Sequence, residues 1–191
     1  MSSYTRLRQK GGTFFFTVAL QARGLRLLVE HVDVLRRAVA QTRAERPFVL
    51  DAWVVLPDHL HAVWTLPDDD TDYSTRWGAI KARFSRNVRR AGFTPPPHLP
   101  KVTSGRFAGV NPGLRVGKGE VGIWQRRFWE HAVRDKRDYR AHVEYCWGNP
   151  VKHGFVQRAV DWPYSSIHRD IRLGRVAPEW AGGVLEGDFG E

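Results

Sequence analysis

Three apolar runs in the first third of the chain predict β-strands. They cover residues 13–20, 48–56 and 59–66, and aromatic or β-branched side chains dominate the first of them. Such side chains fit a pleated, half-buried surface, which favours strands. Only Pro57 and Asp58 separate the second run from the third, so we expect these two strands to be neighbours in a sheet.

Between and after these strands, apolar residues recur at helical spacing. Residues 32–46 predict an amphipathic helix that ends before Pro47, and residues 73–90 predict a second helix. Arginines lie largely on the polar face of the second helix, which we expect to be exposed. The apolar stripe of that helix consists of Trp77, Ile80, Phe84 and Val88.

The last third of the chain continues the alternation of strand and helix. A looser apolar run at 123–133 predicts a fourth strand, and Asp135 is expected to cap a helix that stops at Pro150. A short helix is expected near residues 167–173. The order β-α-β-β-α-β with an added helix predicts an α+β domain of ferredoxin-like plan with an antiparallel sheet.

Two segments fall outside this pattern. Residues 92–122 contain three consecutive prolines and several glycines, which predicts a long loop that is mobile before it meets a ligand. Residues 176–191 form an acidic, glycine-rich tail. We therefore expect a single domain over residues 1–175, followed by the tail.

The composition is typical of a folded globular chain, because 42% of the residues are hydrophobic. No apolar stretch approaches the roughly 18 residues of a membrane helix, and the first residues lack the apolar region of a signal peptide. The single cysteine, Cys146, excludes an internal disulfide and suits a reducing compartment. We expect a cytoplasmic protein without membrane contact.

The chain is strongly basic, with 30 Lys and Arg against 20 Asp and Glu and a formal net charge of +10. No basic residue follows Arg175, so residues 1–175 carry +14. Such a field attracts polyanions, and the forked guanidinium group suits phosphate oxygens. Nucleic acid is therefore the preferred partner. A basic surface that only maintains solubility is the alternative.

Six arginines are the candidates for contacts to nucleic acid. One lies in a basic N-terminal arm, three lie on the helix at 73–90, and two stand beside aromatic residues in the run at 123–133. Aromatic rings among arginines suit the stacking of unpaired bases. For the helical arginines, an ordinary solvated face is the alternative. The six are Arg8, Arg76, Arg83, Arg86, Arg126 and Arg127.

Two histidines at the start of the third strand are candidate metal ligands. Successive side chains of a strand alternate between faces, so His59 and His61 point the same way while Leu60 points the other way. Two imidazoles on one face can bind one divalent ion. The alternative is a pair of solvated or core histidines, and the His-x-His spacing alone does not decide between the two.

The last long helix supplies a candidate nucleophile. Its apolar stripe includes Tyr139, whereas Tyr145 lies on another side that it shares with Asn149, one turn further along. A phenol beside an amide oxygen, facing the histidine pair, could attack a phosphodiester that a metal ion polarises. An ordinary surface tyrosine is the alternative.

Four motifs in order give the chain a specific resemblance. It resembles the single-tyrosine HUH transposases, and most of all the branch of REP-associated tyrosine transposases, over roughly residues 4–174. The motifs are Leu56-Pro57-Asp58-His59-Leu60-His61, Phe84-Ser85-Arg86, Trp124-Gln125-Arg126-Arg127-Phe128-Trp129-Glu130-His131, and Tyr145-x-x-x-Asn149-Pro150-Val151-Lys152-His153-Gly154.

The resemblance implies a catalytic HUH domain with a defined set of roles. His59 and His61 would be metal ligands with Asn149 as the third, and the usual ion is Mg²⁺ or Mn²⁺. Tyr145 would cut single-stranded DNA, hold the 5′ end as a phosphotyrosine and release a 3′ hydroxyl. The expected partner is a palindromic repeat folded into a hairpin, bound by a monomer or a homodimer. Because Tyr139 lies off the active face, one tyrosine is expected to act.

Two other classes of protein remain as alternatives. A DNA-hairpin binding protein could keep this fold without cutting, and the intact set of two histidines, tyrosine and asparagine argues against that. A metal-dependent hydrolase of another substrate could use the same histidines. Such a hydrolase would not explain the arginine-rich surface or the tyrosine beside Asn149.

Overall fold

The computed structural model of the chain describes residues 9–94, 122–182 and 189. Four strands form one antiparallel sheet in the order β2-β3-β1-β4. The succession of elements and the order of the strands are those of a ferredoxin-like α+β domain, which confirms the predicted fold class. The strands are β1 Thr13–Ala19, β2 Val49–Val55, β3 His59–Thr65 and β4 Trp129–Ala132.

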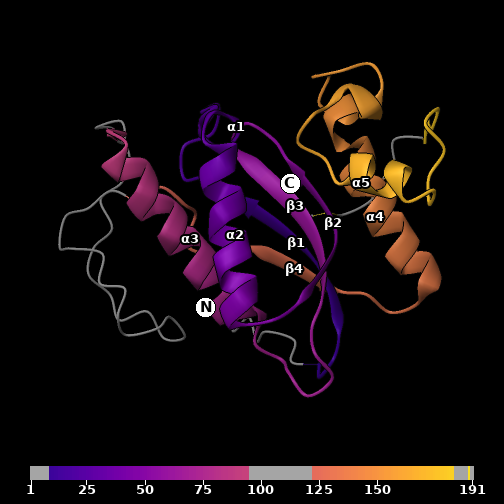
Figure 1. Cartoon of the computed structure of the whole chain (residues 1–191), viewed down its shortest axis with the longest axis horizontal. Helices are drawn as coiled ribbons and strands as arrows, with labels where there is room; N and C mark the ends of the chain where they lie inside the picture. Colours follow the sequence, from indigo (N-terminus) through magenta and orange to yellow (C-terminus); the bar gives the residue numbers. More distant parts are fainter. Residues whose placement is uncertain (1–8, 95–121, 183–188, 190–191) are drawn as a thin grey trace, which may run out of the picture.

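The helices cover the two faces of this sheet unequally. Figure 1 shows α2 and α3 side by side on one face, and α4 with α5 on the other. The helices of the described residues are α1 Leu27–Glu30, α2 Val32–Glu45, α3 Tyr73–Arg90, α4 Lys136–Lys152 and α5 Ile167–Arg172, with a 3₁₀ turn at Ala159–Asp161. None of the helices in this part of the chain is long and apolar enough to cross a membrane.

The face under α2 and α3 holds the aromatic core. Alternation along the strands sends Phe14 and Phe16 of β1 and Trp64 of β3 to this face, and all three are buried. Trp77 of α3 stacks on Trp64 with ring centroids 4.1 Å apart. These rings fix α3 to the sheet and leave the opposite face of the strands for other chemistry.

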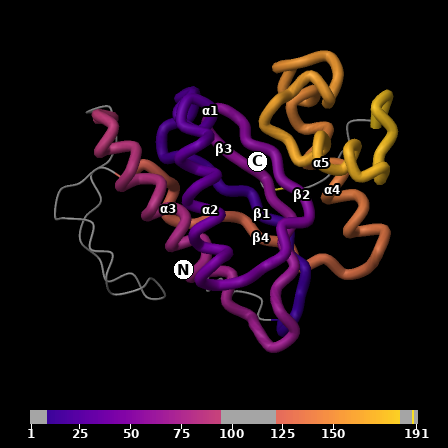
Figure 2. Tube along the Cα trace, viewed as in Figure 1, coloured from indigo at the N-terminus to yellow at the C-terminus, as the bar shows by residue number. Residues whose placement is uncertain are grey.

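On that opposite face, one row of residues crosses all four strands. Val54, His61, Thr17 and Trp129 are successive partners in the register. Helix α4 packs over this row from the side of β2 and β3. The outer edge of β2 pairs with the segment that follows α4, because Val54 and Ser165 form an isolated β-bridge. Figure 2 shows this C-terminal segment alongside β2.

Helix α4 departs from the sequence prediction at its end. It continues through Pro150 to Lys152, where a stop at Pro150 was predicted. Proline removes only one helical hydrogen bond, and so close to the end of a helix the loss is small. The N–H groups of His153 and Phe155 then bond to the carbonyls of Asn149 and Pro150 at 3.0 and 2.9 Å, which closes the last turn.

Other predicted boundaries hold with smaller changes. The strand predicted at 123–133 is shorter, because only Trp129–Ala132 joins the sheet as β4 and Trp124 forms an isolated bridge to Leu20. Helix α1 was not predicted. Most of the loop predicted at 92–122 lies outside the described residues, so its expected mobility stays a prediction.

Candidate active site

The two histidines of β3 lie under α4, as the strand alternation predicts. His59 and His61 are 2% and 0% exposed. Their ring centroids are 5.2 Å apart and the ring planes are nearly perpendicular, at 83°. The two imidazoles therefore face a common buried volume from neighbouring positions of one strand.

Hydrogen bonds at Nδ1 fix the protonation of both rings. His59 Nδ1 lies 2.7 Å from Oδ1 of Asp58, and a carboxylate can only accept, so this nitrogen carries the proton. His61 Nδ1 lies 2.8 Å from the hydroxyl of Thr17. That hydroxyl donates its only hydrogen to the carbonyl of Phe189 at 2.6 Å, so it accepts from His61. In each ring the lone pair is left on Nε2.

A nitrogen lone pair directed into a buried space is the donor that a divalent metal ion needs. Nε2 of His59 is buried and has no hydrogen-bond partner among the described residues. Orientation of the other ring nitrogen by a carboxylate or hydroxyl is the usual second layer of a metal site. The histidine pair therefore fits a bound divalent ion.

The electrostatics keep His59 neutral. Burial lowers the pKa of His59 below its ordinary value, and the neighbouring Asp58 only partly offsets this effect. For Asp58, burial acts to raise the pKa, but hydrogen bonds from His59 and from the N–H of Gly24 outweigh it and hold the pKa below the usual range. A neutral imidazole next to an ionised carboxylate is the form that binds metal.

Helix α4 brings Tyr145 to the histidines. Tyr145 is 3% exposed, and its ring centroid lies 5.3 Å from that of His61. Asn149, one helical turn later, is 1% exposed. Tyr139 lies apart from them and donates to Oδ1 of Asp51 at 3.3 Å. The structure thus groups Tyr145 with the histidines and leaves Tyr139 outside, as the helical faces indicated.

Two further side chains contact Tyr145, and sequence reasoning assigned neither of them. The amine of Lys152 donates to the Tyr145 hydroxyl at 3.0 Å. The ring of Phe189, from the C-terminal tail, stacks on the Tyr145 ring with centroids 3.6 Å apart and planes 14° from parallel. Phe189 therefore reaches the centre of the candidate site.

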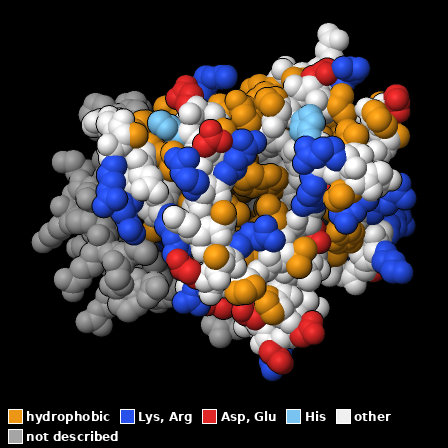
Figure 3. Space-filling view, viewed as in Figure 1, with side chains coloured by type: hydrophobic (Ala, Val, Ile, Leu, Met, Phe, Trp, Pro, Cys, Tyr) orange, Lys and Arg blue, Asp and Glu red, His pale blue; other side chains and the backbone are white. Residues whose placement is uncertain are grey.

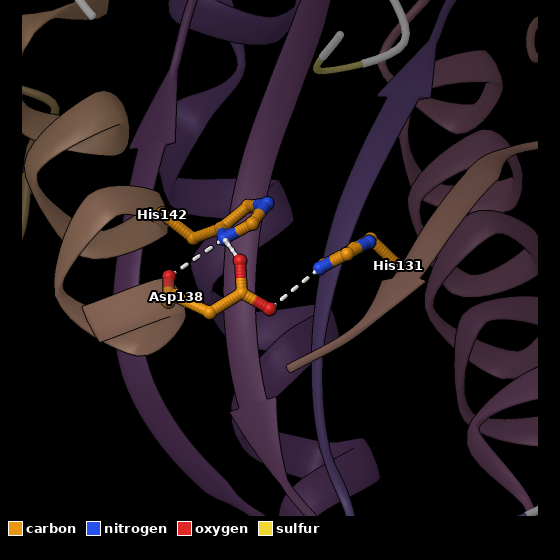
Figure 4. Close-up of side chains that lie close together, drawn as sticks. All are labelled: His131, Asp138 and His142. Atoms are coloured by element: carbon orange, nitrogen blue, oxygen red, sulfur yellow. Dashed lines mark hydrogen bonds and ion pairs between the residues drawn. The ribbon is translucent and has the colours of Figure 1, made fainter. Parts of the chain in front are cut away.

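A second cluster of metal-ligand side chains lies at the start of α4. His131, Asp138 and His142 bring one ligand atom each within 4.8 Å of one another (Figure 4). His131 Nε2 lies 2.8 Å from the Asp138 carboxylate, and the two histidine rings stack at 4.5 Å. Arg134 also donates to Asp138 at 3.0 Å, so a cation already balances this carboxylate. The sequence places these residues on two elements, and only the fold brings them together.

The six candidate arginines have different environments. Arg76 is 2% exposed, and its guanidinium bonds to the carbonyls of Arg46, Pro47 and Asp72 and to the Asp70 carboxylate. The prediction that Arg76 contacts nucleic acid is therefore wrong. Its partners come from the end of α2 and from the loop before α3, which the helical pattern of α3 cannot reveal.

The remaining arginines are more accessible. Arg83 binds Glu45 and Thr42 of α2, at 2.5 and 2.7 Å, and is partly buried. Arg86, Arg126 and Arg127 are exposed, whereas Arg8 lies outside the described residues. Figure 3 shows Lys and Arg side chains on both sides of a recess with a hydrophobic floor. The exposed positions of Arg86, Arg126 and Arg127 are compatible with contacts to nucleic acid.

Comparison with known proteins gives close relatives over the whole chain. A REP-associated tyrosine transposase of Escherichia coli strain K12 is 42% identical over 191 residues, which cover 100% of this chain and 98% of the relative. A Haemophilus influenzae relative, provisionally assigned to the same family, is 41% identical over 182 residues, or 95% and 94% of the two chains. No protein-family model matches the chain.

A solved structure agrees with the fold along the full length. The structure of a REP-associated tyrosine transposase bound to a REP hairpin superposes with a TM-score of 0.81, at 42% identity and with 100% and 98% of the two chains covered. The ferredoxin-like antiparallel sheet is that of the single-tyrosine HUH transposases. This chain belongs to their branch of REP-associated tyrosine transposases, which are DNA-cleaving and joining enzymes.

Proposed function

We propose that this chain is a metal-dependent nuclease and strand transferase for single-stranded DNA, acting on hairpin-forming palindromic repeats. The observation that carries the proposal is the placement of Tyr145 against the histidine pair, with its ring 5.3 Å from that of His61. The relative solved with a REP hairpin supports the choice of partner. The net charge of +10 supports binding to a polyanion.

In the proposed reaction, the Tyr145 oxygen attacks phosphorus and the bond from phosphorus to the 3′ oxygen breaks. The phenol gives up its proton, and the leaving 3′ oxygen takes one up to become a hydroxyl. The 5′ end stays on the protein as a phosphotyrosine. Because this ester keeps the energy of the broken bond, a 3′ hydroxyl can attack it to rejoin DNA without ATP.

His59, His61 and Asn149 would hold the divalent ion, Mg²⁺ or Mn²⁺. When bound, the ion supplies polarisation of the phosphodiester. The buried Nε2 of His59 supports this assignment, because a polar atom in that position is costly without a ligand. Two imidazole nitrogens are softer ligands than Mg²⁺ prefers, which favours Mn²⁺ over Mg²⁺.

The proposal is tested with a pool of end-labelled hairpin oligonucleotides that carry randomised single-stranded flanks. With Mn²⁺, the wild-type protein should form a covalent adduct that survives denaturation, and EDTA should prevent the adduct. Tyr145→Phe should abolish the adduct and retain binding, because only one hydroxyl is lost. Tyr139→Phe, the matched control on the same helix, should react nearly as the wild type.

The metal ligands are tested on the same pool. His59→Ala should bind hairpins but form no adduct, and it should lose Mn²⁺ binding measured by calorimetry. A protein that binds hairpins and never forms an adduct would be the silent binding protein that the sequence leaves open. Cutting without an adduct at Tyr145 would favour a hydrolase.

A further inference from the structure

Lys152 is placed to act on the oxygen of Tyr145. It is the last residue of α4, two helical turns beyond Tyr145 and therefore on the same side of the helix. Its Nζ lies 3.0 Å from the Tyr145 hydroxyl oxygen and 5.0 Å from the centroid of the ring. The side chain itself is largely exposed, so it reaches the buried phenol from the solvent side.

The aromatic surroundings of Tyr145 are unfavourable for a phenolate. The ring is 3% exposed and contacts Phe15 of β1 and Phe189 of the tail. Removing an ionised oxygen from water costs free energy unless an opposite charge or a hydrogen-bond donor accompanies it. Among the described residues, His61 of β3 and Lys152 of α4 are titratable groups that contact this ring.

Of these two groups, Lys152 is the one that carries a positive charge at neutral pH. Nδ1 of His61 is bound to Thr17, and a metal-binding imidazole is neutral. Lys152 stands at the C-terminal end of α4, where the helix dipole favours a cation. A charge-assisted hydrogen bond from an ammonium group to a phenolate is stronger than one to a phenol.

We propose that Lys152 is a catalytic residue whose ammonium group stabilises the Tyr145 oxygen as a phenolate, both when it attacks and when it leaves. The inference rests on the proposed role of Tyr145 as nucleophile. In cleavage the phenol proton passes to water, the bond from Oη to phosphorus forms, and the bond from phosphorus to the 3′ oxygen breaks. The 3′ oxygen then takes a proton from water.

Rejoining reverses these steps, so the same contact should act in both directions. A 3′ hydroxyl loses its proton to water and attacks the phosphotyrosine, and the phenolate leaves beside Lys152. The lysine keeps its own proton throughout and transfers none. A lysine that only anchors the end of α4 would affect both reactions equally at every pH.

The kinetic test is a pH–rate profile for single-turnover cleavage of a hairpin oligonucleotide that the wild type cuts. Lys152→Met should move the rising limb to higher pH by about 1 unit and slow cleavage about tenfold at neutral pH. Higher pH should restore the rate, because hydroxide then supplies the phenolate. Lys152→Arg should keep most of the activity, since it keeps the charge.

Lys136→Met provides the matched control, because it removes an exposed lysine at the other end of α4. It should leave the profile unchanged. Rejoining of a preformed adduct should slow in Lys152→Met as well. An unchanged profile in Lys152→Met, or a loss that high pH does not restore, would overturn the proposal while leaving Tyr145 as nucleophile.

A comparison of two variants separates this inference from the proposed function. Tyr145→Phe should remove cleavage and rejoining entirely, whereas Lys152→Met should slow both reactions without removing them. Cleavage that persists in Tyr145→Phe would refute the proposed function. Equal rates and equal pH profiles in the wild type and Lys152→Met would refute only the role of Lys152.

Discussion

Tyr139 and Tyr145 lie six residues apart on one helix and have opposite environments. Tyr145 contacts His61 and Lys152, and the ammonium group of Lys152 can stabilise its oxygen as an anion. The hydroxyl of Tyr139 donates a hydrogen bond to the carboxylate of Asp51. Burial first, and then the negative charge of Asp51, raise the pKa of Tyr139 to about 12. The contrast supports the proposal that Tyr145, and not Tyr139, is the nucleophile, on the grounds of charge as well as position.

The raised pKa of Tyr139 makes stability depend on alkaline pH. In the unfolded chain this phenol ionises near pH 10, roughly two units lower than in the fold. Its contribution to stability is therefore complete below about pH 10 and is lost as the pH rises towards 12. Urea unfolding between pH 9 and 12 should show a smaller loss of stability in Tyr139→Phe than in the wild type.

Absorbance at 295 nm provides the control for that experiment. The difference between wild type and Tyr139→Phe should be one tyrosinate that appears near pH 12. A phenol that titrates near pH 10 would contradict the assigned burial and the contact with Asp51.

At the scale of elements, Arg76 joins α3 to the end of α2. Its guanidinium has four acceptors, and the hydrogen bond from Arg76 is the main cause that holds the pKa of Asp70 below its usual range. Asp70 therefore adds stability above the pKa of an unfolded aspartate, near 3.9, and loses it in acid. The pair contributes to the packing of α2 against α3.

Removing Arg76 should destabilise the protein. Arg76→Met would leave three carbonyls and a carboxylate without their donor, and we expect a loss of about 1–3 kcal/mol in urea unfolding at neutral pH. Arg86→Met, on an exposed position of the same helix, should change stability by less than about 0.5 kcal/mol. Equal small effects would mean that Arg76 is not the structural link described here.

The strand β3 and the helices α3 and α4 show which features of the fold the sequence predicts and which it does not. Alternation along β3 was enough to place His59 and His61 on one face, and the helical spacing separated Tyr145 from Tyr139. A helical pattern does not show which groups an arginine contacts outside its own helix. For that reason the pattern predicted an exposed Arg76, whereas the structure buries it. The contact between Lys152 and Tyr145 was not predicted, because the helix was expected to stop at Pro150. In the structure α4 continues to Lys152 and places its side chain beside Tyr145.

Contacts between distant segments are beyond any local pattern. Thr17 and His61 are neighbours because β1 pairs with β3, and Phe189 joins them from the far end of the chain. The cluster of His131, Asp138 and His142 likewise needs β4 and α4 in place. Sequence periodicity predicts the elements and their faces, but tertiary packing decides which side chains meet.

For the whole molecule, the sheet separates the aromatic core under α2 and α3 from the candidate active site under α4. The exposed arginines belong to segments around this sheet, and residues 1–175 carry a formal charge of +14. Neutralised phosphates release counterions, so the affinity for DNA should fall steeply with salt. The contribution of each arginine to DNA binding then follows from the change in the salt dependence of the affinity when that arginine is replaced.

Arg126 and Arg127 are the pair to test, because both are exposed, whereas Arg83 is partly buried and bound to Glu45. If both contact phosphate, replacing the pair by alanine should reduce the slope of log K against log salt by about 1–2 units. Covalent adduct formation at saturating DNA should persist. Arg36→Ala, an exposed arginine that pairs with Asp33 on α2, is the control and should leave the slope unchanged. Unchanged slopes for the pair would direct the search to Arg86 or Arg8.

The stacking of Phe189 on Tyr145 makes the availability of the nucleophile a matter of populations. If a DNA strand at the tyrosine displaces Phe189 from its present place, the apparent affinity is the intrinsic affinity multiplied by the fraction of molecules in which Phe189 is displaced. If Phe189 covers Tyr145 nine-tenths of the time, adduct formation at low DNA concentration falls about tenfold. Phe189→Ala should recover that factor, and Leu173→Ala, an exposed apolar control, should not. The gain measures the closed population, and excess DNA should erase it.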